Sequence, residues 1–191
     1  MDDAADPAGV FIDACVDDLD KARRLFEADP QVLYLTMVGS PMLHWFVIED
    51  FQIAVQRMLE VFKVDVHHRN DCGETAIHAA CMSGRLGSLR LLIKHGADLD
   101  AFHGVLDEPP LQLAIRHQHI DVALQLMESG AKLDYLIDDF TTVLHAVAGL
   151  PQSNKSTMTN ALAKRGITRE SLFESLKLGD EFDSVEDFFD S

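Results

Sequence analysis

Nine histidines and three cysteines are the residues of this chain whose types could support catalysis or metal binding. Cys81 lies three residues after His78, a spacing that could pair a thiol nucleophile with an imidazole base. His67 and His68 are adjacent, and imidazole nitrogens are frequent metal ligands. No cysteine stands at ligand spacing from the histidine pair, and no general acid or oxyanion site accompanies Cys81. We therefore expect no catalytic residue, no metal and no cofactor; a small thiol- or metal-dependent enzyme is the alternative from a different functional class.

The charge of the chain is concentrated at its two ends. The formal net charge is -16, from 32 acidic and 16 basic residues. Residues 1–20 contain seven aspartates and no base, and residues 168–191 contain eight acids against two bases. Binding to phosphates needs clustered Lys and Arg, so we expect no direct contact with nucleic acid. The acidic ends favour a protein partner with a basic surface.

The length of 191 residues suits one structural unit rather than two ordinary domains. No apolar run approaches the roughly 20 residues that cross a bilayer, and the first residues are acidic where a signal peptide is basic and then apolar. Three scattered cysteines, Cys15, Cys72 and Cys81, are typical of free thiols in a reducing compartment. We expect a monomer that does not contact membranes, in the cytoplasm, with the nucleus or a host cell's cytosol as alternatives.

A segment that recurs after about 34 residues is the strongest signal in the sequence. Residues 73–81 read GETAIHAAC, a leucine-rich stretch follows, and residues 95–100 read HGADLD. The sequences PLQLA at 110–114 and SGAKLD at 129–134 occupy the corresponding places in the next copy. This pattern strongly resembles the ankyrin repeat, from whose G-x-T-P-L-H-x-A-A motif it differs mainly by Ala76 in place of proline.

Weaker copies flank these two, so the resemblance covers about nine-tenths of the chain. It implies an all-α ankyrin-repeat solenoid of about five stacked helix-turn-helix units over residues 1–167, followed by a C-terminal capping helix. We expect a degenerate N-terminal cap at 6–36 and units near 37–69, 70–102, 103–136 and 137–167.

The motif residues have structural roles before any functional one. Thr75 is placed to cap the first helix of its unit, and His78 can join backbone groups across the repeat. Gly96 and Gly130 suit the left-handed conformation that ends a helix. A further stripe at helical spacing, Leu89, Leu92 and Ile93, is expected to pack on the next unit. The repeat assigns no role to His67, His68, His103 or His117.

The last segment, 168–191, combines a capping helix with an acidic tail rich in phenylalanine. Thr168 can begin the helix and Gly179 can end it. The aromatic residues of the tail have two interpretations, both of which stay open. They fold back onto the last repeat and close its core, or they form an acidic and hydrophobic motif that docks on another protein or covers this one's own surface.

The resemblance also implies a concave face, made of turn tips and first helices, that binds other proteins. In the third unit, the match to the repeat motif assigns the following residues to that face: Arg69, Asp71, Cys72, Glu74, Met82 and Ser83. In the fourth unit they are Glu108, Arg116 and His117, and in the fifth turn Asp138 and Asp139.

The function implied is that of a non-catalytic adaptor or competitive inhibitor that occupies a protein surface. Small ankyrin proteins similar to the inhibitors of NF-κB are one subclass, because they combine repeats with an acidic C-terminal tail that covers a basic surface. A microbial or viral ankyrin effector inside a host cell is the other.

Overall fold

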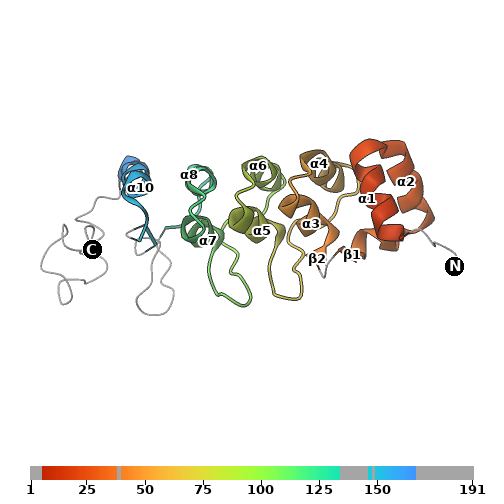
Figure 1. Ribbon diagram of the computed structural model, residues 1–191, viewed down its shortest axis with the longest axis horizontal. Coiled ribbons are helices and arrows are strands. Elements are labelled where there is room, and N and C mark those ends of the chain that lie inside the picture. The colour runs from red at the N-terminus through yellow and green to blue at the C-terminus, as the bar shows by residue number, and fades with distance from the viewer. Residues whose placement is uncertain (1–5, 38–39, 134–145, 148, 167–191) are drawn as a thin grey trace, which may run out of the picture.

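The computed structural model describes residues 6–37, 40–133, 146–147 and 149–166. Helix pairs stack side by side, and Figure 1 shows the helices in two parallel rows with the connecting loops projecting to one side. The predicted all-α repeat solenoid is therefore confirmed. Within the described ranges no helix is long and apolar enough to span a membrane. The predicted capping helix and tail at 168–191 lie outside the described residues.

The helices follow one another as pairs along the chain. One row, called the inner helices here, contains α3 (Met42–Ile48), α5 (Ala76–Ser83) and α7 (Pro110–Arg116); the other, the outer helices, contains α4 (Gln52–Glu60), α6 (Leu86–Lys94), α8 (Ile120–Glu128) and α10 (Gln152–Lys164). The N-terminal pair is α1 (Pro7–Asp17) and α2 (Leu19–Ala28), followed by the 3-10 helix η1 (Pro30–Tyr34). Strands β1 (Thr36–Met37) and β2 (Ser40–Pro41) then form a short antiparallel ribbon with Thr36 opposite Pro41.

Acidic residues near the N-terminus begin the first two helices. The Asp6 carboxylate accepts hydrogen bonds from the backbone N–H groups of Ala8 and Gly9 at 3.1 and 3.2 Å. The Asp18 carboxylate accepts one from the N–H of Lys21 at 2.9 Å. A negative charge is favourable at a helix N-terminus, where N–H groups lack partners within the helix. Part of the acidic end therefore has a local structural role.

The core is continuous along the stack and is built from residues at helical spacing. Leu89 and Leu92 are fully buried on α6, as the predicted stripe requires, whereas Ile93 is only half-buried. Ala80 and Ala114 are fully buried on the inner helices, where small side chains allow α5 and α7 to pack against each other. Each unit therefore buries apolar residues both between its own two helices and against the neighbouring units.

A residue with a left-handed backbone separates the inner from the outer helix at the same position of three successive repeats. The three residues are Asp50, Gly84 and Gln118, with φ of 62°, 67° and 61°. Only the middle one is the glycine that this conformation favours. A Cβ on Gly84 would also lie 2.5 Å from Nδ1 of His119 in the next unit, so any other residue there would require His119 or the backbone to shift.

Replacing Gly84 with Ala is expected to lower the free energy of unfolding by about 1–2 kcal/mol from the left-handed backbone alone, with the His119 contact adding to that loss. Urea denaturation followed by circular dichroism measures the change. The matched control is Asp50→Ala, which keeps a Cβ in the same turn of the preceding unit. An equal loss in both variants would contradict the steric role of His119.

Hydrogen bonds from side chains to carbonyl groups join neighbouring units. His78 Nε2 donates to the carbonyl of Ala101 at 2.7 Å, and its Nδ1 accepts from the N–H of Thr75 at 3.0 Å. The predicted scaffold role of His78 and the N-cap role of Thr75 are confirmed. Arg57 Nη1 donates to the carbonyl of Cys15 at 2.7 Å in the same way.

Candidate functional site

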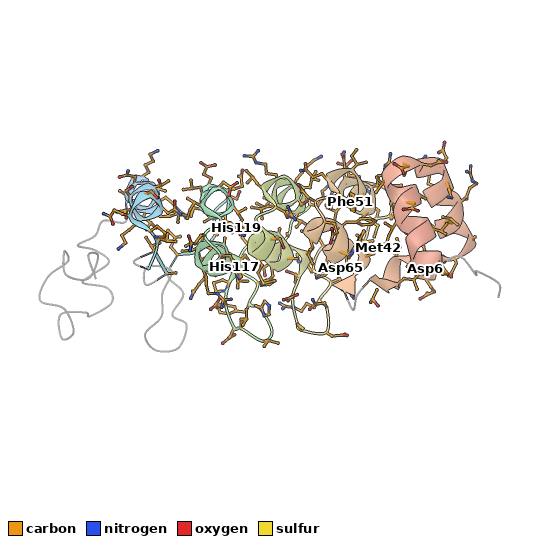
Figure 2. All side chains as sticks on the ribbon, viewed as in Figure 1. Asp6, Met42, Phe51, Asp65, His117 and His119 are labelled. Atoms are coloured by element: carbon orange, nitrogen blue, oxygen red, sulfur yellow. The ribbon has the colours of Figure 1, made fainter. Side chains whose placement is uncertain are left out.

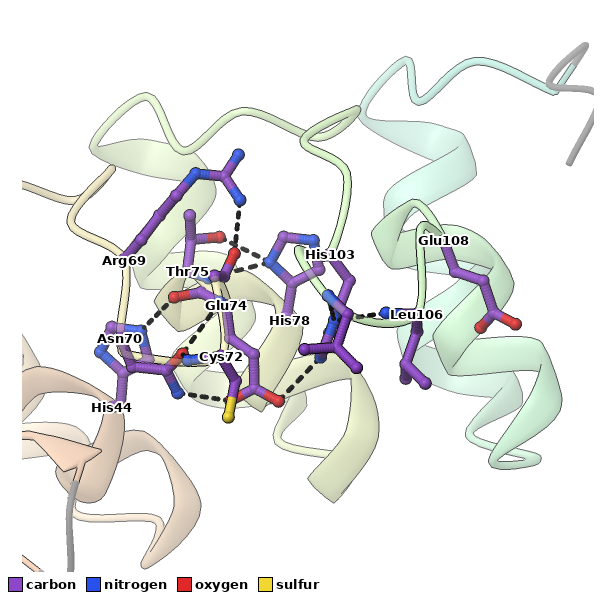
Figure 3. Close-up of polar contacts among 12 residues, drawn as sticks. His44, Arg69, Asn70, Cys72, Glu74, Thr75, His78, His103, Leu106 and Glu108 are labelled. Atoms are coloured by element: carbon purple, nitrogen blue, oxygen red, sulfur yellow. Dashed lines mark hydrogen bonds and ion pairs between the residues drawn. The ribbon is translucent and has the colours of Figure 1, made fainter.

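The turn before α5, residues 69–75, is held in shape by its own polar side chains (Figure 3). Asn70 Oδ1 accepts hydrogen bonds from the N–H groups of Cys72 and Glu74 at 3.0 and 2.9 Å. Asn70 Nδ2 donates to Glu74 Oε2 at 2.6 Å. These bonds leave Asp71 and Cys72 exposed at the tip, where both are available to a partner.

Arg69 connects this turn to the next one. Its Nη1 donates to the carbonyl of Gly73 in its own turn and to that of Phe102 at 2.8 Å in the following turn. Its guanidinium thus already donates hydrogen bonds to two backbone carbonyls of the protein itself. Arg69 was predicted to contact a partner; its position shows a role in fixing two adjacent turns, and contact with a partner stays a prediction.

Glu74 and His103 form a second connection between the same turns. His103 Nδ1 accepts hydrogen bonds from the N–H groups of Val105 and Leu106, both at 3.1 Å, so the ring proton is on Nε2. Nε2 donates to Glu74 Oε1 at 2.8 Å. Burial would raise the pKa of Glu74, but the hydrogen bonds from Asn70 and His103 outweigh it and the pKa is lowered. Glu74 therefore remains an anion inside the scaffold.

His103 is a residue that sequence reasoning left without a role. It is buried, and its ring meets that of His78 edge to face, with the ring centroids 5.5 Å apart. The signal that could have found it is its place in the repeat, because it stands one full repeat after Arg69. Two different side chains at one position of the repeat therefore both connect neighbouring turns.

The C-terminal ends of the inner helices form a row across the stack, which we call the inner-helix row. The repeat spacing places Ile48, Met82 and Arg116 at the same point on α3, α5 and α7. Ile48 is 36% exposed, Met82 is half-buried and Arg116 is exposed. The next positions along the helices hold Ser83 and His117. Met82, Ser83, Arg116 and His117 were predicted as partner-binding residues, and the structure brings them together with Ile48, which was missed.

Further apolar side chains are exposed on α4 and in the turn before it. Phe51 and Ile53 are 37% and 58% exposed. The Trp45 ring lies against Phe51, with 5.6 Å between the ring centroids. Phe51 and His119 both occupy the turn between an inner and an outer helix, on the face shown in Figure 2. Grouped apolar side chains of this kind are typical of surfaces that bind other proteins.

The turn before α7 carries both an ion pair and exposed apolar residues. Arg116 Nη2 lies 3.1 Å from Glu108 Oε2. Burial raises the pKa of Glu108, and the nearby Arg116 opposes that shift only in part. Val105 is 71% exposed at the tip, and sequence reasoning did not identify it. Asp138 and Asp139 lie outside the described residues.

The thiol and imidazole that the sequence spaces three residues apart, Cys81 and His78, do not form a nucleophile and base pair in the structure. The Cys81 thiol is completely buried, and burial raises its pKa, so it is not an activated nucleophile. Both nitrogens of His78 are occupied by hydrogen bonds, which leaves no base for Cys81. No group of three or more His, Cys, Asp or Glu side chains in this part of the chain is arranged to hold a metal ion.

Residues 43–139, about half of the chain, match the family of ankyrin repeats in three copies. This chain belongs to the ankyrin-repeat family. Ankyrin repeats are protein-interaction modules, and their stacking creates extended concave surfaces for binding.

Several known ankyrin-repeat proteins are similar in sequence. The NF-kappa-B inhibitor cactus of Drosophila melanogaster is 36% identical over 102 residues, which cover 53% of this chain and 20% of cactus. The nuclear factor NF-kappa-B p105 subunit of Mus musculus is 31% identical over 126 residues, covering 64% of this chain and 13% of p105. The target of rapamycin complex 2 subunit AVO2 of Saccharomyces cerevisiae is 29% identical over 105 residues, which cover 53% of this chain and 24% of AVO2. The similarity thus spans a quarter or less of these relatives.

Membership of the ankyrin family explains why the same positions recur in the site. His44 and His78 both donate from Nε2 to a carbonyl in the following turn, Glu74 at 2.9 Å and Ala101 at 2.7 Å. The ankyrin turns are therefore held at fixed spacing, and the inner-helix row is presented on a rigid surface.

Proposed function

We propose that this ankyrin-repeat chain is a non-catalytic protein-binding module whose partner contacts the inner-helix row. The observation that carries the proposal is the grouping of Ile48 and Met82 with Arg116 across three helices. Met and Arg are enriched at protein interfaces, and Arg is among the residues that contribute most to binding energy there. Arg69 and Glu74 contribute by holding the turns, while Asp71 and Cys72 offer exposed polar contacts at a tip.

The partner is proposed to be a protein with a basic surface around an apolar patch. The net charge of -16 attracts such a partner over long range, whereas the inner-helix row supplies the short-range contact. We propose that the chain acts as a monomer in the cytoplasm, and the three unpaired thiols suit a reducing compartment.

Competitive inhibition is favoured over an adaptor role by the names of two relatives. Cactus is named as an NF-kappa-B inhibitor, and p105 is named as a subunit of the same factor. By extension, we propose that the partner of this chain is a factor of the NF-κB type, and that binding blocks another interaction of that factor.

The decisive variant changes three residues of the inner-helix row, of which only Met82 also packs against the core. Ile48→Ser, Met82→Ser and Arg116→Ser together are expected to weaken binding to the partner by about 10- to 100-fold, because they remove two apolar anchors and one cation. Affinity capture from native lysate with mass spectrometry identifies the partner, and titration calorimetry with the purified partner and with an NF-κB subunit measures the affinity.

The matched control places the same number of serines on the outer helices, as Glu128→Ser, Asn160→Ser and Lys164→Ser. All three positions are exposed. Both variants should retain the helical circular dichroism and melting of the wild type. Equal affinity in the wild type and the inner-helix variant would refute the proposed binding face. If the chain binds no NF-κB subunit but still binds a different partner, only the proposed inhibition of a factor of the NF-κB type is refuted.

A further inference from the structure

A patch of apolar side chains lies on α3, on α4 and in the turn between them, and we call it the Trp45 patch. It consists of Trp45, Phe51 and Ile53, of which Phe51 and Ile53 are 37% and 58% exposed. The Phe51 ring packs against Trp45, with 5.6 Å between the ring centroids, and against the buried Phe46, with 6.4 Å. Phe51, labelled in Figure 2, lies in the turn between α3 and α4. Aromatic contacts therefore fix the patch to the core of its unit.

The ankyrin repeat does not require apolar residues at the exposed positions of the patch. In the two following repeats, the places of Phe51 and Ile53 hold polar residues or glycine: Arg85 and Gly87, then His119 and Asp121. The same pair of helices forms in those units without an apolar side chain at either place. The grouping of exposed apolar residues is thus particular to this unit, as is typical of a surface that binds a partner.

The Trp45 patch lies in the more acidic part of the described stack. Residues 6–60 contain ten acids and four bases, whereas residues 61–133 contain nine acids and seven bases. Glu49 and Asp50 are exposed in the turn directly before Phe51, and residues 45–53 include no base. Carboxylates beside an apolar surface favour a partner that is both apolar and basic.

Two arginines near the patch are directed to backbone carbonyls. Arg57, one helical turn after Ile53, donates from Nη1 to the carbonyl of Cys15 at 2.7 Å. Arg85 donates from Nε to the carbonyl of Ile48 at 2.9 Å. Both carbonyls lie in the last turn of an inner-facing helix, α1 or α3, where a cation offsets the partial negative charge of the helix end. The carboxylates of the turn thus remain available to a partner.

We propose that the Trp45 patch is a second binding surface, separate from the inner-helix row, for a basic amphipathic helix of a partner protein. The apolar face of that helix covers Phe51 and Ile53, and its lysine or arginine side chains lie beside Glu49 and Asp50. A helix suits the patch because it presents apolar side chains and cations next to each other on one continuous face.

The first test uses Trp45 as a reporter, because it is the single tryptophan of the chain. The full chain is titrated with a monomeric synthetic peptide of about 18 leucine and lysine residues whose leucines lie along one helical face. We expect a saturable change in Trp45 fluorescence, with a dissociation constant of about 100 μM or below at low ionic strength. A peptide of the same composition with dispersed leucines should bind at least about tenfold more weakly. No saturable change, or equal affinity for both peptides, would overturn the proposal.

Charge and apolar variants locate the site. Ile53→Ser should weaken binding of the peptide by about three- to tenfold, because it removes an apolar contact. Glu49→Gln with Asp50→Asn should weaken it by a similar factor, about three- to tenfold, and reduce its dependence on salt. The matched control, Asp121→Asn with Glu128→Gln, removes the same charge from exposed positions on α8 and should leave the affinity within about twofold. Equal weakening in the control would show that net charge alone attracts the peptide.

Two further measurements separate this surface from other occupants. Met82→Ser with Arg116→Ser changes the inner-helix row and should leave the affinity for the peptide unchanged. A weakening there would place the peptide on the row and overturn a separate surface. Sedimentation velocity of the full chain without peptide should show a monomer. A dimer that Ile53→Ser dissociates would assign the patch to a second copy of this chain and overturn the proposal.

Discussion

Replacing Leu92 with Ala is expected to lower the free energy of unfolding by about 2–5 kcal/mol, because it opens a cavity in the middle of the stack. The Leu92 side chain is fully buried on α6, and α6 packs against both α4 and α8. In a repeat array, stability arises from such contacts between neighbours. The loss should therefore spread to the adjacent units rather than remain local.

Equilibrium unfolding in urea, followed by circular dichroism, measures the effect of Leu92→Ala. The control on the same helix is Arg90→Ala, since Arg90 is exposed and its hydrogen bond to Gln125 is on the surface. That change should cost less than about 1 kcal/mol. A loss below about 0.5 kcal/mol for Leu92→Ala would show that the side chain is not buried between units.

Acid is expected to destabilise the protein between about pH 6.5 and pH 4 through the buried histidines. Burial lowers the pKa of His78 to about 4, although its hydrogen bond to Ala101 opposes the shift. In the unfolded chain the pKa is 6.5, so the unfolded state takes up a proton before the folded state does. The stability held above pH 6.5 is therefore lost as the pH falls, by about 3 kcal/mol when pH 4 is reached. His44 contributes in the same direction.

Urea denaturation at half-unit steps from pH 7.5 to 4 gives the pH dependence. His78→Gln is the matched variant, because an amide can donate to Ala101 and accept from Thr75 without titrating. It should be less stable than the wild type at pH 7 and have a much smaller slope between pH 6.5 and 4. A slope equal to that of the wild type would assign the acid sensitivity to other groups.

The structural roles of motif residues in the third and fourth units could be predicted from the sequence, because these residues have the same role in every copy of the repeat. The sequence alone predicted that Thr75 caps a helix, that His78 joins neighbouring units and that Leu92 lies in the core. The left-handed backbone at Asp50 and Gln118 was not predicted, because neither residue is a glycine. The short β1–β2 ribbon was likewise not predicted.

The candidate site was predictable as a face but not residue by residue. Repeat alignment finds which positions lie on turn tips and inner helices, and so it indicated Met82 on α5 and Arg116 on α7, whose contact with a partner stays a prediction. It does not show which of these side chains form hydrogen bonds within the protein. Arg69 and Glu74 are engaged by Phe102 and His103, and these contacts depend on how two turns approach each other in space.

The hydrogen bonds that join neighbouring units also bear on how the protein would respond to force and how it would fold. Among the described residues, each side-chain bond of this kind connects positions no more than 42 residues apart, the longest being that from Arg57 to Cys15. Such a low contact order is typical of fast folding that starts locally and propagates along the chain. Under tension applied at its two ends, the array should extend in successive steps of one unit, and each lost unit should reform independently once the tension is released.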